Sequence, residues 1–327
     1  MIHNVGEVPT GPSFAFTAFG DSGYQVPFQA NLTLAKNLAV PLGIHLGDMT
    51  YSSSLTNITE FANKIKNTLG TTFPFMLTAG NHEGNGGTRD GLLREFVSRL
   101  PPQLALDPAA QANISRYYAV RYYFDYPQPN PYTRFILVTP GEGSRWGVEG
   151  SFNVGSESHT WLRDSIRGAR ALGYPWVIVC WHKNYISAGG KSNEVGSTIM
   201  NLCFTEKVDL ILQGHEHNYQ RSKGLGNPVS PVTILEQGPN AFTKGVGTVL
   251  MINGTGGQTS LDPFNAIDGD AQYFAAWWGN NGQERPASTG YRNPTYGSGY
   301  FRVTPTRIDG GYRAAVPGVY KDDYVIA

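Results

Sequence analysis

Short apolar runs separated by amphipathic stretches dominate the pattern of hydrophobic and polar positions along the chain. Each run is too short for a helix and rich in residues that favour extended backbone, so we interpret these runs as buried β-strands. They span residues 14–20, 40–47, 73–80, 174–181 and 208–214. Helical patterns lie between several of them, for example over residues 157–173 and 193–207. This alternation of strands and helices predicts an α/β fold.

The middle and the end of the chain have a different pattern. Residues 115–140 alternate aromatic and polar side chains around a Pro-Asn turn, which is typical of a β-hairpin. Residues 249–257 and 299–308 are again β-rich. Residues 141–155 and 274–299 are rich in glycine and aromatic residues without clear periodicity, so we expect long loops there. Because no repeat or linker-like stretch divides the chain, we expect residues 1–327 to form one domain.

Composition excludes several classes of function. The chain has 25 basic and 25 acidic residues, so its formal net charge is zero. This bulk charge does not favour binding to nucleic acid or to an anionic membrane. No apolar run approaches the length of about 18 residues that a membrane span needs. The two cysteines, Cys180 and Cys203, are too few for a disulfide scaffold or a zinc–cysteine cluster. We expect Cys180 to be a small buried residue in a strand, and the spacing leaves open whether the two cysteines pair.

Side chains that can bind metal ions follow each of the five predicted strands. In chain order they are Asp21, then Asp48 and Tyr51, then Asn81 and His82, then His182, and finally His215 and His217. Ligands of open α/β sheets bind beyond the carboxyl ends of the strands, so we expect these side chains to converge on one site. Each alone could be a turn residue, a partly buried phenol or a core histidine, but such residues would be scattered. We assign His45, inside a strand, to the core.

The chemistry of this set suits two metal ions. Two carboxylates, a phenol, an amide and four imidazoles are too many ligands for one ion. Two cations about 3.5 to 4 Å apart need a shared anionic bridge, which Asp48 could supply. His215 and His217 are two apart, so in an extended chain they point the same way and can bind one centre or two adjacent ones. Oxygen ligands on one side and nitrogen and amide ligands on the other suit cations of different charge.

The motifs GDSG, GDMTY, GNHE and GHEH, with a lone histidine at 182, closely resemble those of the calcineurin-like metallophosphoesterases. The resemblance runs from about Phe14 to Val303 and implies a four-layer α-β-β-α sandwich. The superfamily generally carries a histidine two residues after its first aspartate, where this chain has Gly23. Tyr51, three residues after Asp48, is similar instead to the tyrosine by which purple acid phosphatases hold ferric iron.

This resemblance implies a dinuclear acid phosphatase that hydrolyses phosphate monoesters by attack of a metal-bound hydroxide. The first metal, expected to be Fe(III), would be bound by Asp21, Asp48, Tyr51 and His217. The second metal, Fe(II), Zn(II) or Mn(II), would be bound by the shared Asp48 and by Asn81, His182 and His215. His82 would not be a ligand but would protonate the leaving alkoxide. Glu83 and Asn218 are candidates for orienting the imidazoles.

The chain also departs from the family. Plant-type purple acid phosphatases carry a β-sandwich domain before the catalytic one, and Asp21 lies too near the start for it, so a single catalytic domain is implied. Family members often place further histidines after the lone one to contact phosphate. Here Lys183 and Tyr185 are the candidates, and solvated surface is an equal alternative. Trp146, Phe152, Trp277 and Trp278 could form an aromatic wall for a large organic phosphate, or fold back onto the core.

Two other functions stay open at this point. One is a phosphodiesterase on the same scaffold that acts on nucleotides or lipid head groups. The other is a binding protein that has kept the fold and lost turnover. Low charge, abundant glycine and tyrosine, and the resemblance favour a secreted or periplasmic protein whose signal was removed, with the cytoplasm as alternative.

Overall fold

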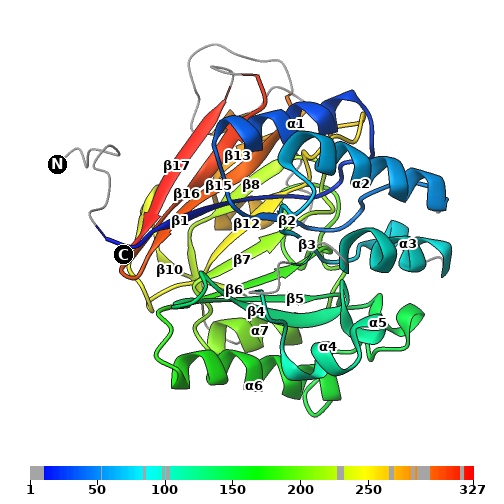
Figure 1. Cartoon of the computed structure of the whole chain (residues 1–327). Helices are drawn as coiled ribbons and strands as arrows, with labels where there is room; N and C mark the ends of the chain where they lie inside the picture. Colours follow the sequence, from blue (N-terminus) through cyan, green and yellow to red (C-terminus); the bar gives the residue numbers. More distant parts are fainter. Residues whose placement is uncertain are drawn as a thin grey trace.

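A computed structural model describes residues 11–327 except 53, 84–85, 98–99, 101–103, 227–231, 265–268, 281–283, 286–294 and 317–319. Its elements form two large β-sheets that face each other, with helices on the outer sides (Figure 1). β9 (Gly224–Gly226) and β10 (Thr233–Glu236) form a separate two-stranded sheet.

The first sheet has the strand order β11-β17-β16-β15-β1-β2-β3. Its strands β1 (Phe14–Phe19), β2 (Gly43–His45) and β3 (Phe75–Leu77) run parallel. β1 pairs antiparallel with β15 (Gly297–Thr304), which continues into β16 (Arg307–Ala314) and β17 (Lys321–Ile326). The short β11 (Ala241–Phe242) ends the sheet. The carboxyl ends of β1, β2 and β3 therefore lie side by side.

The second sheet has the order β14-β13-β8-β12-β7-β6-β5-β4. Four of its strands are parallel neighbours, namely β5 (Thr133–Val138), β6 (Trp176–Trp181), β7 (Leu210–Gln213) and β12 (Val249–Asn253). The antiparallel strands are β4 (Arg121–Tyr126), β8 (Tyr219–Ser222), β13 (Phe274–Trp278) and β14 (Glu284–Arg285). β6 and β7 thus also end next to each other.

Helices cover the outer face of each sheet (Figure 1). α1 (Val26–Asn37) and α2 (Leu55–Leu69) lie over the first sheet, with α3 (Gly86–Phe96) against α2. α6 (Glu157–Ala171) and α7 (Ser197–Thr205) lie over the second. The shorter helices are α4 (Pro108–Ala112), α5 (Ile114–Tyr117), η1 (Asn81–Glu83), η3 (Gly143–Trp146) and η4 (Asp270–Tyr273).

Strand β6 shows why four layers form. All six of its residues are buried, and alternate side chains enter two different clusters. Trp176, Ile178 and Cys180 pack between the sheets. Val177, Val179 and Trp181 pack under α6 and α7. Because side chains alternate across a strand, a continuous apolar run must be covered on both faces. The expected four-layer α-β-β-α sandwich is confirmed.

The predicted elements form with two corrections. All five predicted strands and the hairpin are present, although β2 and β3 are only three residues long. Residues 274–299 are not one long loop, because Phe274–Trp278 forms β13 and Gly297 begins β15. β13 shows no alternation in sequence because both of its faces are largely covered. The second predicted helix begins at Ser197, so residues 193–196 belong to a loop.

Both cysteines are free and buried, Cys180 in β6 and Cys203 in α7. Burial raises the pKa of both thiols well above their ordinary value, so they act as small apolar side chains. No helix among the described residues is long and apolar enough to cross a bilayer.

Candidate metal centre

The loops that follow β1, β2, β3, β6 and β7 meet at one place. The first three strands belong to the first sheet and the last two to the second, so the convergence expected within one sheet occurs between two. Hydrogen bonds join the two sets of loops. The backbone N–H of His215 donates to Asp21 Oδ2 at 2.7 Å. The Nδ1 of His182 lies 2.8 Å from the carbonyl oxygen of Leu46, which fixes Nε2 as the atom that faces the site.

One group of ligand atoms combines Asp21, Tyr51 and His217. The Tyr51 hydroxyl lies 3.2 Å from Asp21 Oδ1 and 3.1 Å from His217 Nε2. The same carboxylate oxygen is 3.4 Å from His217 Nε2. The other ring nitrogen of His217 lies 2.9 Å from the carbonyl oxygen of Ser260. Since that carbonyl can only accept, Nδ1 carries the proton and Nε2 presents a lone pair to the group.

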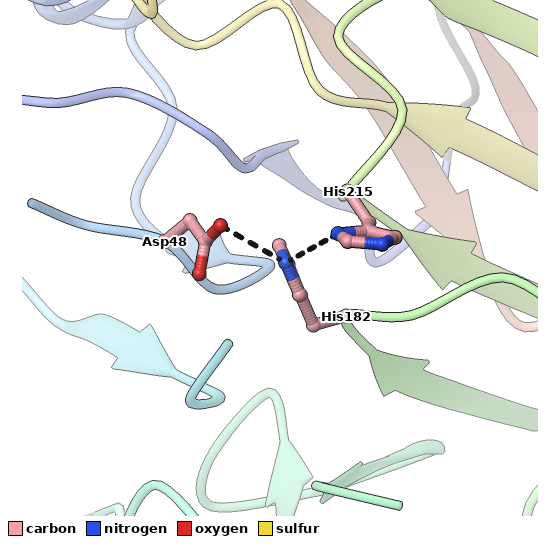
Figure 2. Close-up of side chains that lie close together, drawn as sticks. All are labelled: Asp48, His182 and His215. Atoms are coloured by element: carbon pink, nitrogen blue, oxygen red, sulfur yellow. Dashed lines mark hydrogen bonds and ion pairs between the residues drawn. The ribbon is translucent and has the colours of Figure 1, made fainter. Parts of the chain in front are cut away.

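A second group combines Asp48, Asn81, His182 and His215. Figure 2 shows the His182 ring between the Asp48 carboxylate and the His215 ring. His182 Nε2 is 3.2 Å from Asp48 Oδ2, 3.2 Å from His215 Nδ1 and 3.1 Å from Asn81 Oδ1. Ligand atoms of Asp48, His182 and His215 all lie within 4.8 Å of one another, and all three residues are buried. This spacing is compatible with one metal ion held between them.

The backbone is strained at three of these residues. Asp21, Asp48 and His215 have φ values of 57°, 56° and 74°, in the left-handed region that non-glycine residues rarely adopt. Strain of this kind persists where the surrounding structure enforces it, which is common at functional sites. Close approach of the loops also depends on glycine, because a Cβ at Gly80 would collide with Asp48 Oδ1.

Negative charge dominates the interior of the site. Burial raises the pKa of the Tyr51 phenol far above its ordinary value, and the charges of Asp21 and Asp48 raise it further. Burial alone would lower the pKa of His182, but the same two carboxylates outweigh it and raise that pKa to about 9. The buried carboxylates strongly stabilise the protonated forms of an imidazole and a phenol. Such a site therefore also favours a cation at its centre. Its electrostatics and its donors therefore fit metal ions.

A buried carboxylate holds the ligand loops in place. Glu83 accepts hydrogen bonds from the backbone N–H groups of Asp48 at 2.8 Å, Met49 at 2.8 Å and Gly80 at 2.7 Å. We expected Glu83 to orient an imidazole, but it fixes the backbone that carries Asp48 and Asn81 instead. Glu216, between the two histidines of GHEH, accepts from the backbone of residues 190 and 191 in the same way.

The model of the calcineurin-like phosphoesterase family matches residues 14–219. The chain belongs to the calcineurin-like phosphoesterase family. The matched segment runs from the start of β1 to the start of β8 and contains every candidate ligand. The expected membership is confirmed.

Purple acid phosphatases are among its relatives. Purple acid phosphatase 21 of Arabidopsis thaliana is 24% identical over 200 residues, 58% of this chain and 41% of that protein. Probable inactive purple acid phosphatase 1 of the same plant is 24% identical over 257 residues, 73% of this chain and 39% of that protein. The chain thus spans less than half the length of these curated relatives. The purple acid phosphatase PPD1 of yellow lupin shares the fold, with a TM-score of 0.68, 18% identity, and coverage of 97% of this chain and 54% of that one.

His82 lies at the edge of this site and is partly open to solvent. Its side chain is 43% exposed, its Nε2 is 3.8 Å from Asp48 Oδ2, and its ring centroid is 4.6 Å from that of Tyr51. Its backbone N–H donates to Asp48 Oδ1 at 2.9 Å. His82 therefore borders both groups of ligand atoms while remaining open to solvent.

Charged side chains border the second group. Lys183 pairs with Glu142 at 3.0 Å and lies 3.6 Å from Glu194, whose carboxylate is 2.9 Å from His215 Nε2. Arg145 pairs with Glu142 at 3.0 Å and donates to the carbonyl oxygen of Asn81 at 3.2 Å, with half of its side chain exposed. Among these residues, only Lys183 was predicted from the sequence. Arg145 and Glu142 lie in a stretch without periodicity, and Glu194 in a segment interpreted as helix.

The expected aromatic wall does not form as an exposed surface. Trp146 is 6% exposed, Phe152 is 7% exposed and Trp278 is 1% exposed, so these side chains belong to the core. Trp278 stacks on Tyr320, and the half-buried Trp277 stacks on Phe264 with centroids 4.1 Å apart. The folding back onto the core that the sequence left open as an alternative is the outcome here. Trp278 enters the core because it lies on β13, a strand that is largely covered on both faces.

Three further expectations concern single residues. Tyr185, a candidate for phosphate contact, is partly buried against the cluster under α6 and α7, and that contact stays a prediction. Asn218, expected to orient an imidazole, accepts instead from Gln220 at 3.0 Å. His45 is a buried core residue whose Nε2 lies 2.8 Å from Ser22 Oγ, as expected.

Proposed function

We propose that this chain is a metal-dependent acid phosphatase that hydrolyses phosphate monoesters at a two-metal centre. The observation that carries the proposal is the convergence of two groups of ligand atoms, from loops of both sheets, on a strained and buried backbone. Asp21, Tyr51 and His217 would hold one metal, and Asn81, His182 and His215 the other. Asp48 would bridge them, because a carboxylate can bind one cation through each oxygen.

The character of the donors supports cations of unequal charge. The first group supplies a carboxylate and a phenol, which suit a hard trivalent ion such as Fe(III). The second supplies two imidazoles and an amide oxygen, which suit Fe(II), Zn(II) or Mn(II). The raised pKa of Tyr51 means that the protein alone keeps the phenol protonated, so a cation at its oxygen would be needed to make it a tyrosinate. When bound, the metals would supply Lewis-acid stabilisation of the phosphoryl oxygens and acidify the attacking water.

The surrounding side chains would position the ester. His82 is exposed beside both groups and would donate a proton to the leaving alkoxide. The half-exposed guanidinium of Arg145 lies against the backbone of Asn81 and would hold a phosphate oxygen on the second-metal side. Lys183 is paired with two carboxylates and is a weaker candidate for phosphate contact.

A non-catalytic binding protein is one alternative, because two relatives are named as probably inactive. The complete set of seven candidate ligand residues in this chain favours catalysis, since a protein without turnover has no need to keep strained ligand loops.

Hydrolysis of two nitrophenyl esters tests the proposal. The protein would be stripped with a chelator, reconstituted with iron and zinc, and assayed at pH 5 on 4-nitrophenyl phosphate and on bis(4-nitrophenyl) phosphate. We expect the monoester to be preferred, with activity dependent on metal and lost in Asp48→Asn but not in Asp164→Asn, an exposed carboxylate of α6. Preference for the diester would favour a phosphodiesterase. No turnover by a protein that binds both metals would favour the binding protein.

A further inference from the structure

A cavity of about 250 Å³ lies beside the metal centre. Residues 22–25, which precede α1, and residues 257–259 line it. Tyr51, Ser52 and Asn57, the last in the first turn of α2, complete the lining. The Tyr51 hydroxyl belongs to the first group of ligand atoms, so one side chain separates the cavity from the metal centre.

The lining of this cavity is uncharged and rich in hydrogen-bonding groups. None of the described residues that line it is acidic or basic. The rings of Tyr24 and Tyr51 supply apolar surface, and Gln25, Asn57 and Gln258 supply amides. Within the described part of the chain, the side-chain amides of Gln25 and Asn57 form no hydrogen bond. Gln25, the N-cap residue of α1, makes no capping bond either. These amides are therefore free to bind a ligand.

The cavity is kept open by a residue without a side chain. Gly23 is buried, and a Cβ built on it would meet no atom within 4 Å. Its φ of +59° is in the left-handed region, so the loop adopts a conformation that suits glycine. A larger residue at this position would project into empty space beside Asp21.

The position of His82 relative to the cavity indicates the path that a leaving alcohol would take. The His82 and Tyr51 rings are 4.6 Å apart, and His82 is the proposed acid for the leaving alkoxide. An alcohol that leaves beside His82 would continue along Tyr51 toward Gln25 and Asn57. A volume of 250 Å³ is below the roughly 300–1,000 Å³ typical of pockets for drug-sized ligands. It leaves room for about one ring.

We propose that this cavity binds the leaving group of the substrate and that this group is a neutral, sugar-sized alcohol. The proposal rests on the proposed phosphatase function. Amides would hydrogen-bond the hydroxyl groups of a sugar, and the tyrosine rings would cover its apolar face. The favoured substrate class is therefore a sugar monophosphate.

Substrate selectivity of matched variants tests this subsite. The variants are Gln25→Ala, Asn57→Ala and the double variant. Gln29→Ala is the control, because Gln29 lies on the same helix but its amide donates to Thr68 at 2.9 Å. Each would be assayed on glucose 6-phosphate and on 4-nitrophenyl phosphate. We expect kcat/KM for glucose 6-phosphate to fall roughly tenfold in the double variant. The value for 4-nitrophenyl phosphate should change by less than about twofold, and the control should behave as wild type.

Equal loss for both substrates, or no loss for either, would overturn the subsite. If the wild-type protein hydrolyses neither ester, the proposed function fails, and binding decides the subsite separately. In that case the test is saturation-transfer NMR with glucose 6-phosphate on the zinc-loaded protein. Sugar signals that appear with wild type and Gln29→Ala but vanish in the double variant would support the subsite. Absence of sugar signals with wild type would contradict it.

Discussion

A single methyl group added at Gly80 should disable the metal centre. Gly80 lies just before Asn81, and its Cα faces Asp48. A Cβ built there would lie 2.6 Å from the backbone nitrogen of Asp48 and would overlap Asp48 Oδ1. An ordinary contact needs about 3.4 Å, so the two loops must separate by about 0.8 Å. The Asp48 carboxylate and the Asn81 amide would move apart by a similar amount.

The expected size of the effect follows from that displacement. A misplacement near 1 Å in a catalytic arrangement costs about 100-fold in rate, and catalytic geometry tolerates only about 0.5 Å. We therefore expect Gly80→Ala to lose about 100-fold in kcat/KM and to bind the second metal more weakly. Overpacking should also lower the free energy of unfolding of the metal-free protein by about 1–3 kcal/mol.

Three measurements on one variant pair check this reasoning. The control is Gly196→Ala, because a Cβ at Gly196 meets no atom within 4 Å. Zinc affinity by calorimetry, kcat/KM on 4-nitrophenyl phosphate and urea unfolding would be compared for both variants. If Gly80→Ala binds zinc and turns over within twofold of the control, the close approach of these loops does not position Asp48, and the reasoning is refuted.

Three other predictions concern acid catalysis, phosphate binding and acid stability. His82→Ala should slow hydrolysis of an alkyl phosphate about 100-fold but that of 4-nitrophenyl phosphate much less, since nitrophenolate needs no proton to leave; equal losses in a comparison of the two rates would contradict the role. Arg145→Ala should raise KM about tenfold with little change in kcat, whereas steady-state kinetics of Arg94→Ala, an equally exposed arginine, should match wild type. Burial lowers the pKa of His45 from 6.5 to about 3. Between these values the unfolded chain binds a proton that the folded chain excludes, so the folded state becomes less stable as the pH falls. Between pH 7 and pH 5 the free energy of unfolding, measured with urea, should fall by about 2 kcal/mol more in the wild type than in His45→Gln; an equal pH dependence in the two proteins would exclude the contribution of His45.

The positions of the candidate ligands could be predicted from sequence because they follow apolar runs. A strand such as β6, which is buried on both faces, is a continuous apolar segment in the sequence. The first polar residue after it is His182. The same rule located Asp21, Asp48 and His215. Periodicity could not assign these strands to two sheets, because pairing partners are chosen by contacts between distant segments.

The residues that support the ligands were harder to predict. Glu83 acts on backbone amides of Asp48 and Gly80, a role that leaves no spacing pattern in the sequence. Glu194 reaches His215 only because α7 begins three residues after it, and helix boundaries are poorly defined by propensity. Trp278 was considered for an exposed wall because aromatic loop residues and aromatic core strands have the same composition.

The proposed ferric site can be tested directly by the metal content of the purified protein, measured together with its visible absorption spectrum. We predict iron together with a second metal, and a tyrosinate-to-ferric absorption band that is absent in Tyr51→Phe. Tyr185→Phe, which alters a phenol outside the two ligand groups, should retain the band. Two divalent metals without such a band, or a band that persists in Tyr51→Phe, would contradict the ferric site built on Asp21, Tyr51 and His217.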